Sequence, residues 1–296
     1  MDCEPQLKID LHVHSSASDG SLTPRELLAL AEKEHLSALA LTDHDTLDGA
    51  REAIRLAPAF RVKFTPGVEI SAGPPVNFAI QGSLHILGYG IDLEDRPLNQ
   101  ALKLHQNARK NRNPKILERL KSEGLALEPA EIIVEAGGGQ IGRPHIAQAM
   151  VRKGWVATID EAFDRYLGKG APAYVDKYRI PCEETIALIT TAGGLAVLAH
   201  PQLYGVAEDG VLEELIIHLK GAGLGGLEVF YSQHTLERTA RFAFWAGRHG
   251  LLMTGGSDFH GSINPHISLG YLQEKCPIPG NIYGALAAAC PGIPAL

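Results

Sequence analysis

The chain has 296 residues, 45% of them hydrophobic and 21% charged, which is typical of a soluble globular protein with one large domain or a domain plus an insert. No segment approaches the roughly 18 apolar residues of a membrane helix, and the N-terminus MDCEPQLKID lacks the apolar core of a signal peptide, so we expect a cytoplasmic protein with no membrane partner. The net charge of −7 argues against long duplex nucleic acid as a partner, whereas bound metal ions would still allow an anionic small substrate.

Short apolar segments and helical patterns alternate through the first third of the chain. Thr23 is expected to cap a helix that begins at Pro24, with Glu26 completing a Thr-x-x-Glu capping box. A second helix is expected to begin at Asp45 or Thr46 and to run to about residue 56. Strands are expected at 9–13, 36–41, 62–70 and 84–91.

Residues 95–180 break this alternation and are predicted to form a helical insert domain. Residues 95–123 are typical of one long, polar, basic helix with a bend near Pro114. Shorter helices are expected at 129–135, 144–153 and 159–166, and a strand-like pattern returns at 173–175.

The last third of the chain returns to regular alternation. Helices are expected at 183–192, 209–222 and 235–249, and strands at 194–199, 226–231 and 251–256. Repeated units of a strand followed by a helix favour a parallel sheet or barrel. The predicted architecture is an α/β barrel domain made of residues 1–94 and 181–296, interrupted by the insert at 95–180.

The first expected strand ends in IDLHVHSSASDG. Residues two apart on a strand point to the same face, so His12 and His14 are well spaced to bind one metal ion. A pair of structural histidines is an equally good interpretation of this motif alone. Asp19 follows in a polar loop, where a turn aspartate before Gly20 is the alternative to a ligand.

The next two strands also end in ionisable residues. The second runs into LALTDHD, in which His44 is the stronger ligand candidate and Asp45 is expected to cap the following helix. In the third, Glu69 lies within TPGVEIS. A buried carboxylate is costly unless it is paired or bound to metal, so Glu69 is predicted to be a ligand.

Three further segments add candidates. His85 lies in the apolar strand SLHILGYGID, where a hydrogen-bonded core histidine is the favoured interpretation of the residue alone. His200 ends the strand LAVLAHP. Asp258 and His260 lie two apart in LLMTGGSDFHG, whose glycines permit a close approach of the backbone.

Taken together, several strand-like segments end in His, Asp or Glu. In a parallel barrel the C-terminal ends of the strands form one rim, which is where active sites lie. So many ligands on one rim indicate two or three metal ions, a recurring arrangement for phosphoryl transfer. Mixed imidazole and carboxylate ligands favour zinc, manganese or iron over magnesium or calcium.

The motifs HVHSSASDG, ALTDHD, GVEIS, HILGYG, LAHP and GSDFHG, in this order along nearly the whole chain, resemble the polymerase-and-histidinol-phosphatase (PHP) superfamily. The resemblance implies a distorted (β/α)7 barrel with a trinuclear metal site. It assigns one metal to His12, His14, Glu69 and Asp258, a second to Glu69, His85 and His200, and a third to Asp19, His44 and His260.

Two motifs in the middle of the chain indicate a subgroup of this superfamily. IGRPHIAQAM and DRYLGKGAPAYV are similar to the bacterial 3′,5′-nucleoside bisphosphate phosphatases, whose helical insert caps the barrel. The resemblance implies that Arg143 and His145 face the substrate phosphate, with Lys169 nearby. Arginine binds phosphate through bidentate hydrogen bonds. The alternatives are that Arg143 and Lys169 are solvated charges and that His145 caps the helix beginning near Pro144.

These observations predict a metal-dependent phosphoric monoester hydrolase that removes the 3′-phosphate of nucleotides such as pAp. We expect two or three divalent ions, with Mn²⁺ favoured over Zn²⁺ and Fe²⁺, and Arg143 and His145 as catalytic residues. His145, or His234 in YSQHT, would protonate the leaving group, although His234 can also be interpreted as a surface helix cap.

Three other functions compete with this prediction. One is a 5′-3′ exonuclease on short oligoribonucleotides, and another is a histidinol-phosphate or other sugar-phosphate phosphatase. Many histidinol-phosphate phosphatases of the family have a histidine where Asp19 stands, which argues against that branch. The third, a non-enzymatic metal-binding module, would call for a degraded ligand set, which this sequence does not have.

Overall fold

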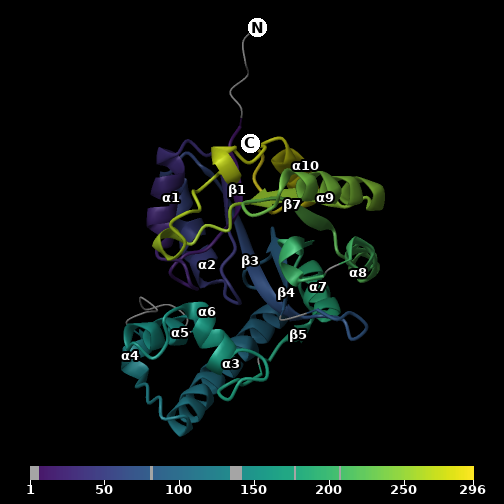
Figure 1. The fold of residues 1–296 in the computed structure, drawn as a ribbon. Helices are drawn as coiled ribbons and strands as arrows, with labels where there is room; N and C mark the ends of the chain where they lie inside the picture. Colours follow the sequence, from purple (N-terminus) through teal and green to yellow (C-terminus); the bar gives the residue numbers. More distant parts are fainter. Residues whose placement is uncertain (1–6, 81–82, 134–141, 177, 207) are drawn as a thin grey trace. The chain divides into compact units, whose positions relative to one another are not determined.

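The structure is a computed structural model that describes residues 7–80, 83–133, 142–176, 178–206 and 208–296 (Figure 1). The chain divides into two compact units, one made of residues 1–101 and 179–296 and the other of residues 102–178. They are called the barrel unit and the insert unit below, and each is described by itself.

The barrel unit is built on one sheet that closes almost completely on itself. Its strands lie in the order β1 (Ile9–Val13), β2 (Ala38–Leu41), β3 (Lys63–Gly73), β4 (Leu84–Tyr89), β6 (Leu195–Leu198), β7 (Gly226–Tyr231) and β8 (Leu252–Gly256), and the short β5 (Ile180–Pro181) pairs with β3. The last strand returns to the first, since the Asp258 N–H donates to the His12 carbonyl at 2.9 Å and Val13 bridges Phe259 in parallel. The predicted distorted barrel is therefore confirmed.

One strand runs against the others. β4 is antiparallel to both β3 and β6, whereas the remaining neighbours along the main path are parallel. The parallel arrangement that the strand and helix alternation favours is interrupted at this point. Residues 74–83, which connect β3 to β4, are fewer than the dozen or more residues of a parallel crossover. As a consequence, the beginning of β4 lies at the same rim as the C-terminal ends of its neighbours.

Helices surround this sheet: α1 (Pro24–Lys33), α2 (Asp48–Leu56), α7 (Cys182–Thr191), α8 (Asp209–Gly221) and α9 (Leu236–His249). The capping box of Thr23 and Glu26 is present at the start of α1, as predicted. The expectation that Asp45 caps α2 is wrong. The Asp45 carboxylate instead accepts the N–H of Ser71 on β3 at 2.8 Å, and α2 begins only at Asp48.

The alternation of side chains along β2 separates two hydrophobic clusters. Ala38 and Ala40 pack in one cluster with α10 (Ile282–Ala289), a helix not predicted from the sequence, whereas Leu39 and Leu41 pack with α1 in the other. Tyr283 of α10 hydrogen-bonds Thr65 near the beginning of β3. The helix α10 therefore covers the end of the barrel opposite the rim that carries the site.

The insert unit is helical. It contains most of α3 (Arg96–Ser122), which has Pro114 in its interior, followed by α4 (Pro129–Ile133), α5 (Arg143–Arg152), α6 (Ile159–Ala162) and a π-helical turn (Phe163–Leu167). The strand-like pattern at 173–175 is a wrong expectation, because these residues form no strand. Instead, the carbonyls of Tyr174 and Val175 accept hydrogen bonds from Arg119 and Arg112 of α3.

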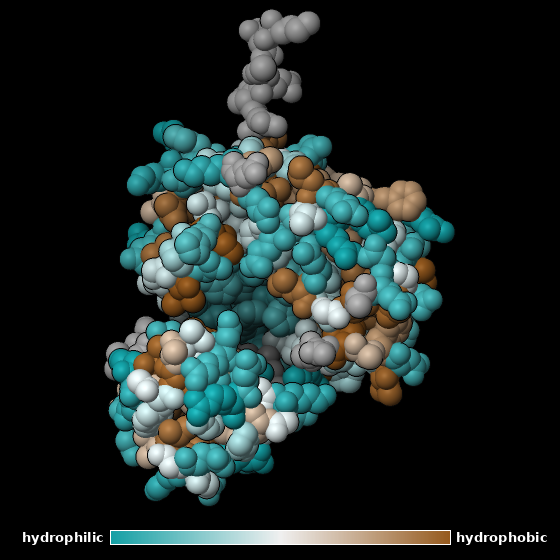
Figure 2. Space-filling view, viewed as in Figure 1, coloured by the Kyte–Doolittle hydropathy of each residue, from teal (hydrophilic) through white to brown (hydrophobic). Residues whose placement is uncertain are grey.

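Hydrophilic residues cover much of the face seen in Figure 2, and hydrophobic residues are scattered between them. Individual large hydrophobic side chains such as Val76 and Leu236 are exposed. Within the described parts of the chain, no helix has both the length and the apolar character needed to cross a membrane.

Candidate metal centre

All the predicted metal ligands converge at one rim of the barrel unit. They include three overlapping groups in which the ligand atoms of each group lie within 4.8 Å of one another. The groups are His12, His14, Glu69 and Asp258; His14, Asp19, His44 and His260; and His44, Glu69 and His85. The remaining predicted ligand, His200, places its Nε2 3.0 Å from Glu69 Oε1.

The first group comes from the ends of β1 and β8 and from the middle of β3. His14 Nε2 lies 3.1 Å from both Glu69 Oε2 and Asp258 Oδ1, and His12 Nε2 lies 3.2 Å from Glu69 Oε2. These four atoms are buried and have no hydrogen-bond partner among the residues that the structure describes. Buried polar atoms are normally paired. Convergent imidazole nitrogens and carboxylate oxygens without partners fit a divalent cation such as zinc, manganese or iron.

The two carboxylate oxygens of Glu69 lie near different histidines. Its Oε2 faces the first group and also lies 3.0 Å from His44 Nδ1. Its Oε1 lies 2.8 Å from His85 Nδ1 and 3.0 Å from His200 Nε2. Since β4 is antiparallel, His85 reaches this rim from the beginning of its strand. Glu69 is fully buried, and both of its oxygens lie within reach of histidines of the site.

The group that contains Asp19 depends on the loop after β1. Asp19 Oδ1 lies 3.3 Å from His260 Nε2, and Asp19 Oδ2 lies 3.7 Å from His44 Nε2. The loop can fold back this far because Gly20 has no side chain: a Cβ there would lie 2.2 Å from the His14 carbonyl oxygen. Gly256 likewise allows β8 to approach β1, because its Cβ would lie 2.1 Å from that of His12. The close backbone approach predicted for this glycine is confirmed.

Burial and neighbouring charges shift the pKa values of the site in opposing directions, and the carboxyls of Glu69 and Asp258 stay ionised. Burial lowers the pKa of His14, but Asp258 and Glu69 outweigh it and raise that pKa to about 10. Burial would raise the pKa of Glu69, but the surrounding histidines hold it well below its usual range. Burial lowers the pKa of His44 to about 3, which keeps that imidazole neutral, the form that binds metal.

Sequence reasoning missed Glu228, which is fully buried on β7. Its Oε1 accepts a hydrogen bond from His12 Nδ1 at 2.9 Å, and its Oε2 accepts the backbone N–H of His200 at 2.7 Å. A carboxylate that holds one ring nitrogen turns the other toward a metal. Glu228 lies within the apolar strand GLEVFY, the same signal that singled out Glu69.

Two further side chains position the site. Asp43, beside His44, accepts hydrogen bonds from the backbone and hydroxyl of Ser15, each at 2.7 Å, and from the hydroxyl of Ser18 at 2.6 Å. These bonds hold the loop that carries Asp19. The Tyr231 hydroxyl donates to Asp258 Oδ2 at 3.1 Å, which leaves Oδ1 directed at the first group.

The predicted phosphate-binding residues lie in the insert unit. Arg143 donates to the Leu167 carbonyl at 2.9 Å, and its guanidinium lies 5.4 and 5.5 Å from the ring centres of Phe163 and Tyr174. His145 Nδ1 accepts the Gly142 N–H at 3.0 Å at the start of α5, so the capping interaction considered for it is present. Lys169 is exposed.

His234 lies in the barrel unit and is only 5% exposed. Its Nδ1 donates to the Val229 carbonyl at 3.0 Å, and α9 is capped by the hydroxyl of Thr235 instead. The interpretation of His234 as a surface helix cap is therefore wrong, because His234 is buried and bonds to a carbonyl of β7.

Known proteins resemble this chain over most of its length. The PHP domain family model matches residues 10–168. The 3′,5′-nucleoside bisphosphate phosphatase of Chromobacterium violaceum is 36% identical over 95% of this chain and 96% of its own, and a 5′-3′ exoribonuclease of Escherichia coli is 34% identical over 93% and 91%. A crystal structure from Bifidobacterium adolescentis, which carries the name of a metal-dependent phosphoesterase, has a TM-score of 0.81 and 30% identity over 97% of each chain.

Proposed function

The chain belongs to the PHP family of metal-dependent phosphoesterases, and from this premise we propose that it removes the 3′-phosphate of 3′,5′-nucleoside bisphosphates such as pAp. The observation that carries the proposal is the set of buried histidine and carboxylate atoms around Glu69 that have no hydrogen-bond partner in the described part of the chain. The relative from Chromobacterium violaceum, similar over 95% of this chain, supports the choice of substrate.

We propose that two or three divalent ions, with Mn²⁺ favoured, are held by His12, His14, Asp19, His44, Glu69, His85, His200, Asp258 and His260. When bound, such ions supply an activated water and positive charge for the phosphate oxygens. Glu228 and Tyr231 fix the directions of His12 and Asp258, so the donor atoms need no rearrangement.

Hydrolysis forms a bond from the oxygen of water to phosphorus and breaks the bond from phosphorus to the 3′-oxygen, which leaves with a proton. Of the two histidines considered as the proton donor, His145 fits better. Its Nδ1 accepts a backbone N–H, so the neutral ring carries its proton on Nε2. Burial lowers the pKa of His234, whose Nδ1 proton is already held by the Val229 carbonyl.

The proposal gives Arg143 and Lys169 the task of binding the phosphates of the substrate. A guanidinium matches the geometry of phosphate oxygens with two parallel hydrogen bonds, and a lysine adds a point charge. Packing of Arg143 over Phe163 and Tyr174 would hold its side chain in one orientation before substrate arrives.

The test is phosphate release by the full chain, stripped of metal and reloaded with manganese, from pAp, 3′-AMP, 5′-AMP and histidinol phosphate in parallel. We expect rapid release from pAp and little from 5′-AMP. A preference for histidinol phosphate would leave the phosphoesterase in place and overturn the proposed substrate.

The second candidate is a 5′-3′ exoribonuclease on short oligonucleotides, favoured by the relative from Escherichia coli that is similar over 93% of this chain. Both reactions break the bond between phosphorus and the 3′-oxygen of a 5′-phosphorylated nucleotide. They differ only in whether the phosphorus carries another nucleoside. Cleavage of the dinucleotide pApA to two molecules of 5′-AMP, at a rate similar to that of pAp, would support this candidate.

A further inference from the structure

The two histidines beside Glu69 Oε1 come from neighbouring antiparallel strands, with His85 near the beginning of β4 and His200 just after the end of β6. Beyond the regular pairing of these strands, one further bond runs from the Ala199 N–H to the His85 carbonyl at 3.0 Å. Two residues that form a hydrogen-bonded pair in an antiparallel ladder exchange two such bonds. The spacing of the two histidines therefore depends on how the second bond, from the His85 N–H, is made.

The hydroxyl of Tyr204 takes the place of this second bond. Its oxygen accepts the His85 N–H at 3.2 Å and donates to the Ala199 carbonyl at 2.6 Å, so it lies between two backbone groups that a regular ladder would bring together. Buried backbone groups need partners, and one hydroxyl can serve both because it donates one proton and accepts through its lone pairs. The two strands are consequently joined through a buried side chain at the point where they carry the proposed ligands.

The backbone of His200 also needs support. Its φ of 23° and ψ of 61° are uncommon for a residue other than glycine, and such a conformation persists only where the surroundings hold it. The peptide between Ala199 and His200 is held at both ends, because its N–H donates to Glu228 at 2.7 Å and its carbonyl accepts the Tyr204 hydroxyl. The His200 carbonyl in turn accepts the Leu203 N–H at 3.0 Å.

A single helical turn brings Tyr204 back to the strand ends. The chain forms a 3-10 turn over Pro201–Tyr204, and Gly205 ends it with a φ of 64°, which glycine adopts without strain. This turn places the centre of the Tyr204 ring 5.9 Å from that of His200. Tyr204 therefore packs beside one proposed ligand and hydrogen-bonds the backbone of the other.

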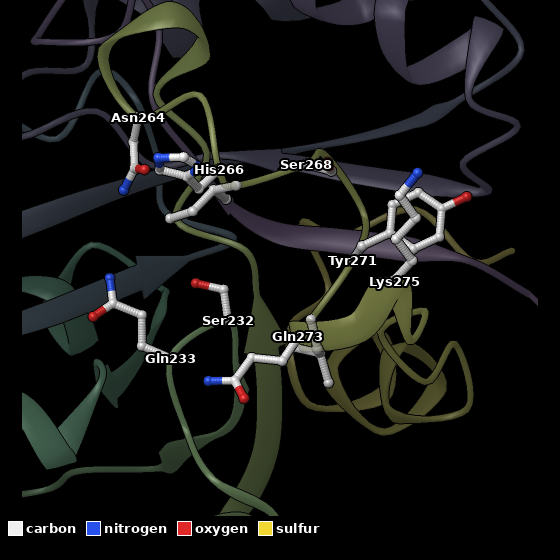
Figure 3. Close-up of a pocket in the computed structure, with 10 residues that line it drawn as sticks. Ser232, Gln233, Asn264, His266, Ser268, Tyr271, Gln273 and Lys275 are labelled. Carbon is white, nitrogen blue, oxygen red and sulfur yellow. The ribbon is translucent and has the colours of Figure 1, made fainter.

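Another buried hydroxyl near the site makes no such link. Ser232 follows Tyr231, whose hydroxyl donates to Asp258, and it is one of the residues that line a cavity of about 420 Å³ (Figure 3). Its Oγ is buried without a hydrogen-bond partner in the described part of the chain. Since this hydroxyl bonds to neither strand, its loss should leave the proposed ligands in place.

We propose that Tyr204 is a positioning residue, whose hydroxyl sets the spacing of His85 and His200 and thereby their affinity for a divalent cation. This inference rests on the metal centre of the proposed function and adds a residue to the support of its ligands. Without the hydroxyl, the His85 N–H and the Ala199 carbonyl either lose their partner or bond to each other directly. Both outcomes move the two histidines relative to Glu69.

The experiment titrates manganese into the metal-free full chain by calorimetry and compares Tyr204→Phe, which keeps the packing of the ring, with two controls that also lose a buried hydroxyl. Tyr283→Phe removes a hydroxyl that bonds Thr65 and the Pro294 carbonyl, and Ser232→Ala removes one without a described partner. For Tyr204→Phe we expect the affinity of one class of manganese sites to fall about 10–100-fold, as when the partner of a ligand is lost, and for the controls to stay within about twofold.

Replacement of Tyr204 by p-aminophenylalanine returns a donor and an acceptor to the same place and should recover most of the lost affinity. Unchanged affinity in Tyr204→Phe, an equal loss in Tyr283→Phe, or no recovery with p-aminophenylalanine would overturn the proposal, because each would reduce Tyr204 to a residue that only packs. The titration involves no substrate. If the unaltered chain fails to hydrolyse pAp, the proposed function falls, and the metal affinities still decide the role of Tyr204.

Discussion

The predicted metal ligands in the barrel unit and the predicted phosphate-binding arginine in the insert unit differ in their hydrogen-bond partners. In the barrel unit, the ligand atoms of His12, His14, Glu69 and Asp258 are buried together and lack hydrogen-bond partners within the described ranges of the chain. In the insert unit, Arg143, predicted to bind phosphate, already donates to a backbone carbonyl and packs on aromatic rings. The barrel unit thus holds a set of donor atoms that fits cations, whereas Arg143 also supports the fold around it. Substitution of the proposed ligands should consequently reduce metal binding, whereas substitution of Arg143 should change substrate binding without loss of metal.

The largest effect is expected for Glu69→Gln. Because both oxygens of Glu69 face histidines of the site, replacing one by an amide removes charge from each side. We expect phosphate release from pAp to fall by about a thousandfold or more, together with a loss of bound metal measured by elemental analysis. Glu184→Gln, at an exposed position of α7, is the control and should retain both.

A smaller effect is expected for Glu228→Gln, which changes the partner of a ligand and leaves the ligand in place. Substitution of such partners typically costs 10–100-fold in metal affinity or activity. Titration with manganese should show weaker binding in that range, and activity should recover at high metal concentration. Metal affinity equal to that of the unaltered chain would show that Glu228 does not orient His12.

Arg143→Lys tests whether the insert unit contributes to substrate binding rather than to metal binding. Lysine keeps the charge but loses the planar fork, so we expect KM for pAp to rise about tenfold while the bound metal stays constant. Arg165→Lys, at a residue of the same unit paired with Glu161, serves as the control. A lower melting temperature with unchanged KM would mean that Arg143 only stabilises the insert.

The smallest effect is expected for Thr23→Ala, on the outer side of the barrel. Loss of the capping hydroxyl should lower the free energy of unfolding by about 1 kcal/mol, measured by urea denaturation. Activity and metal content should not change, because the cap contacts none of the proposed ligands. A loss of activity in the folded variant would show that α1 influences the site.

The sequence predicted the barrel, and it singled out residues that the structure brings together at one rim, because most of them end apolar segments. His85 was the weakest of these from pattern alone. Its strand runs antiparallel, and hydrophobic periodicity carries no information about strand direction. Asp45 was misjudged for a related reason: its partner, the N–H of Ser71, lies on another strand, and tertiary contacts of this kind do not appear in local patterns.

Other features escaped prediction because identical local signals have different outcomes. Glu228 and Glu69 both lie in apolar strands, yet one contacts His12 from the side away from the proposed metal and the other lies at the centre of the site. Residues 173–175 have the composition of a strand, but their carbonyls bond to arginines of α3, so no strand forms. The assignment of each ligand to a particular metal stays a prediction.

The most direct test of the account is to measure the manganese content and the pAp turnover of the same purified, reloaded protein. We predict two or three ions per chain, and activity that rises with occupancy and disappears when the ions are removed by a chelator. Full turnover of pAp by protein that holds fewer than two ions per chain would contradict the shared role of Glu69 on which the account depends.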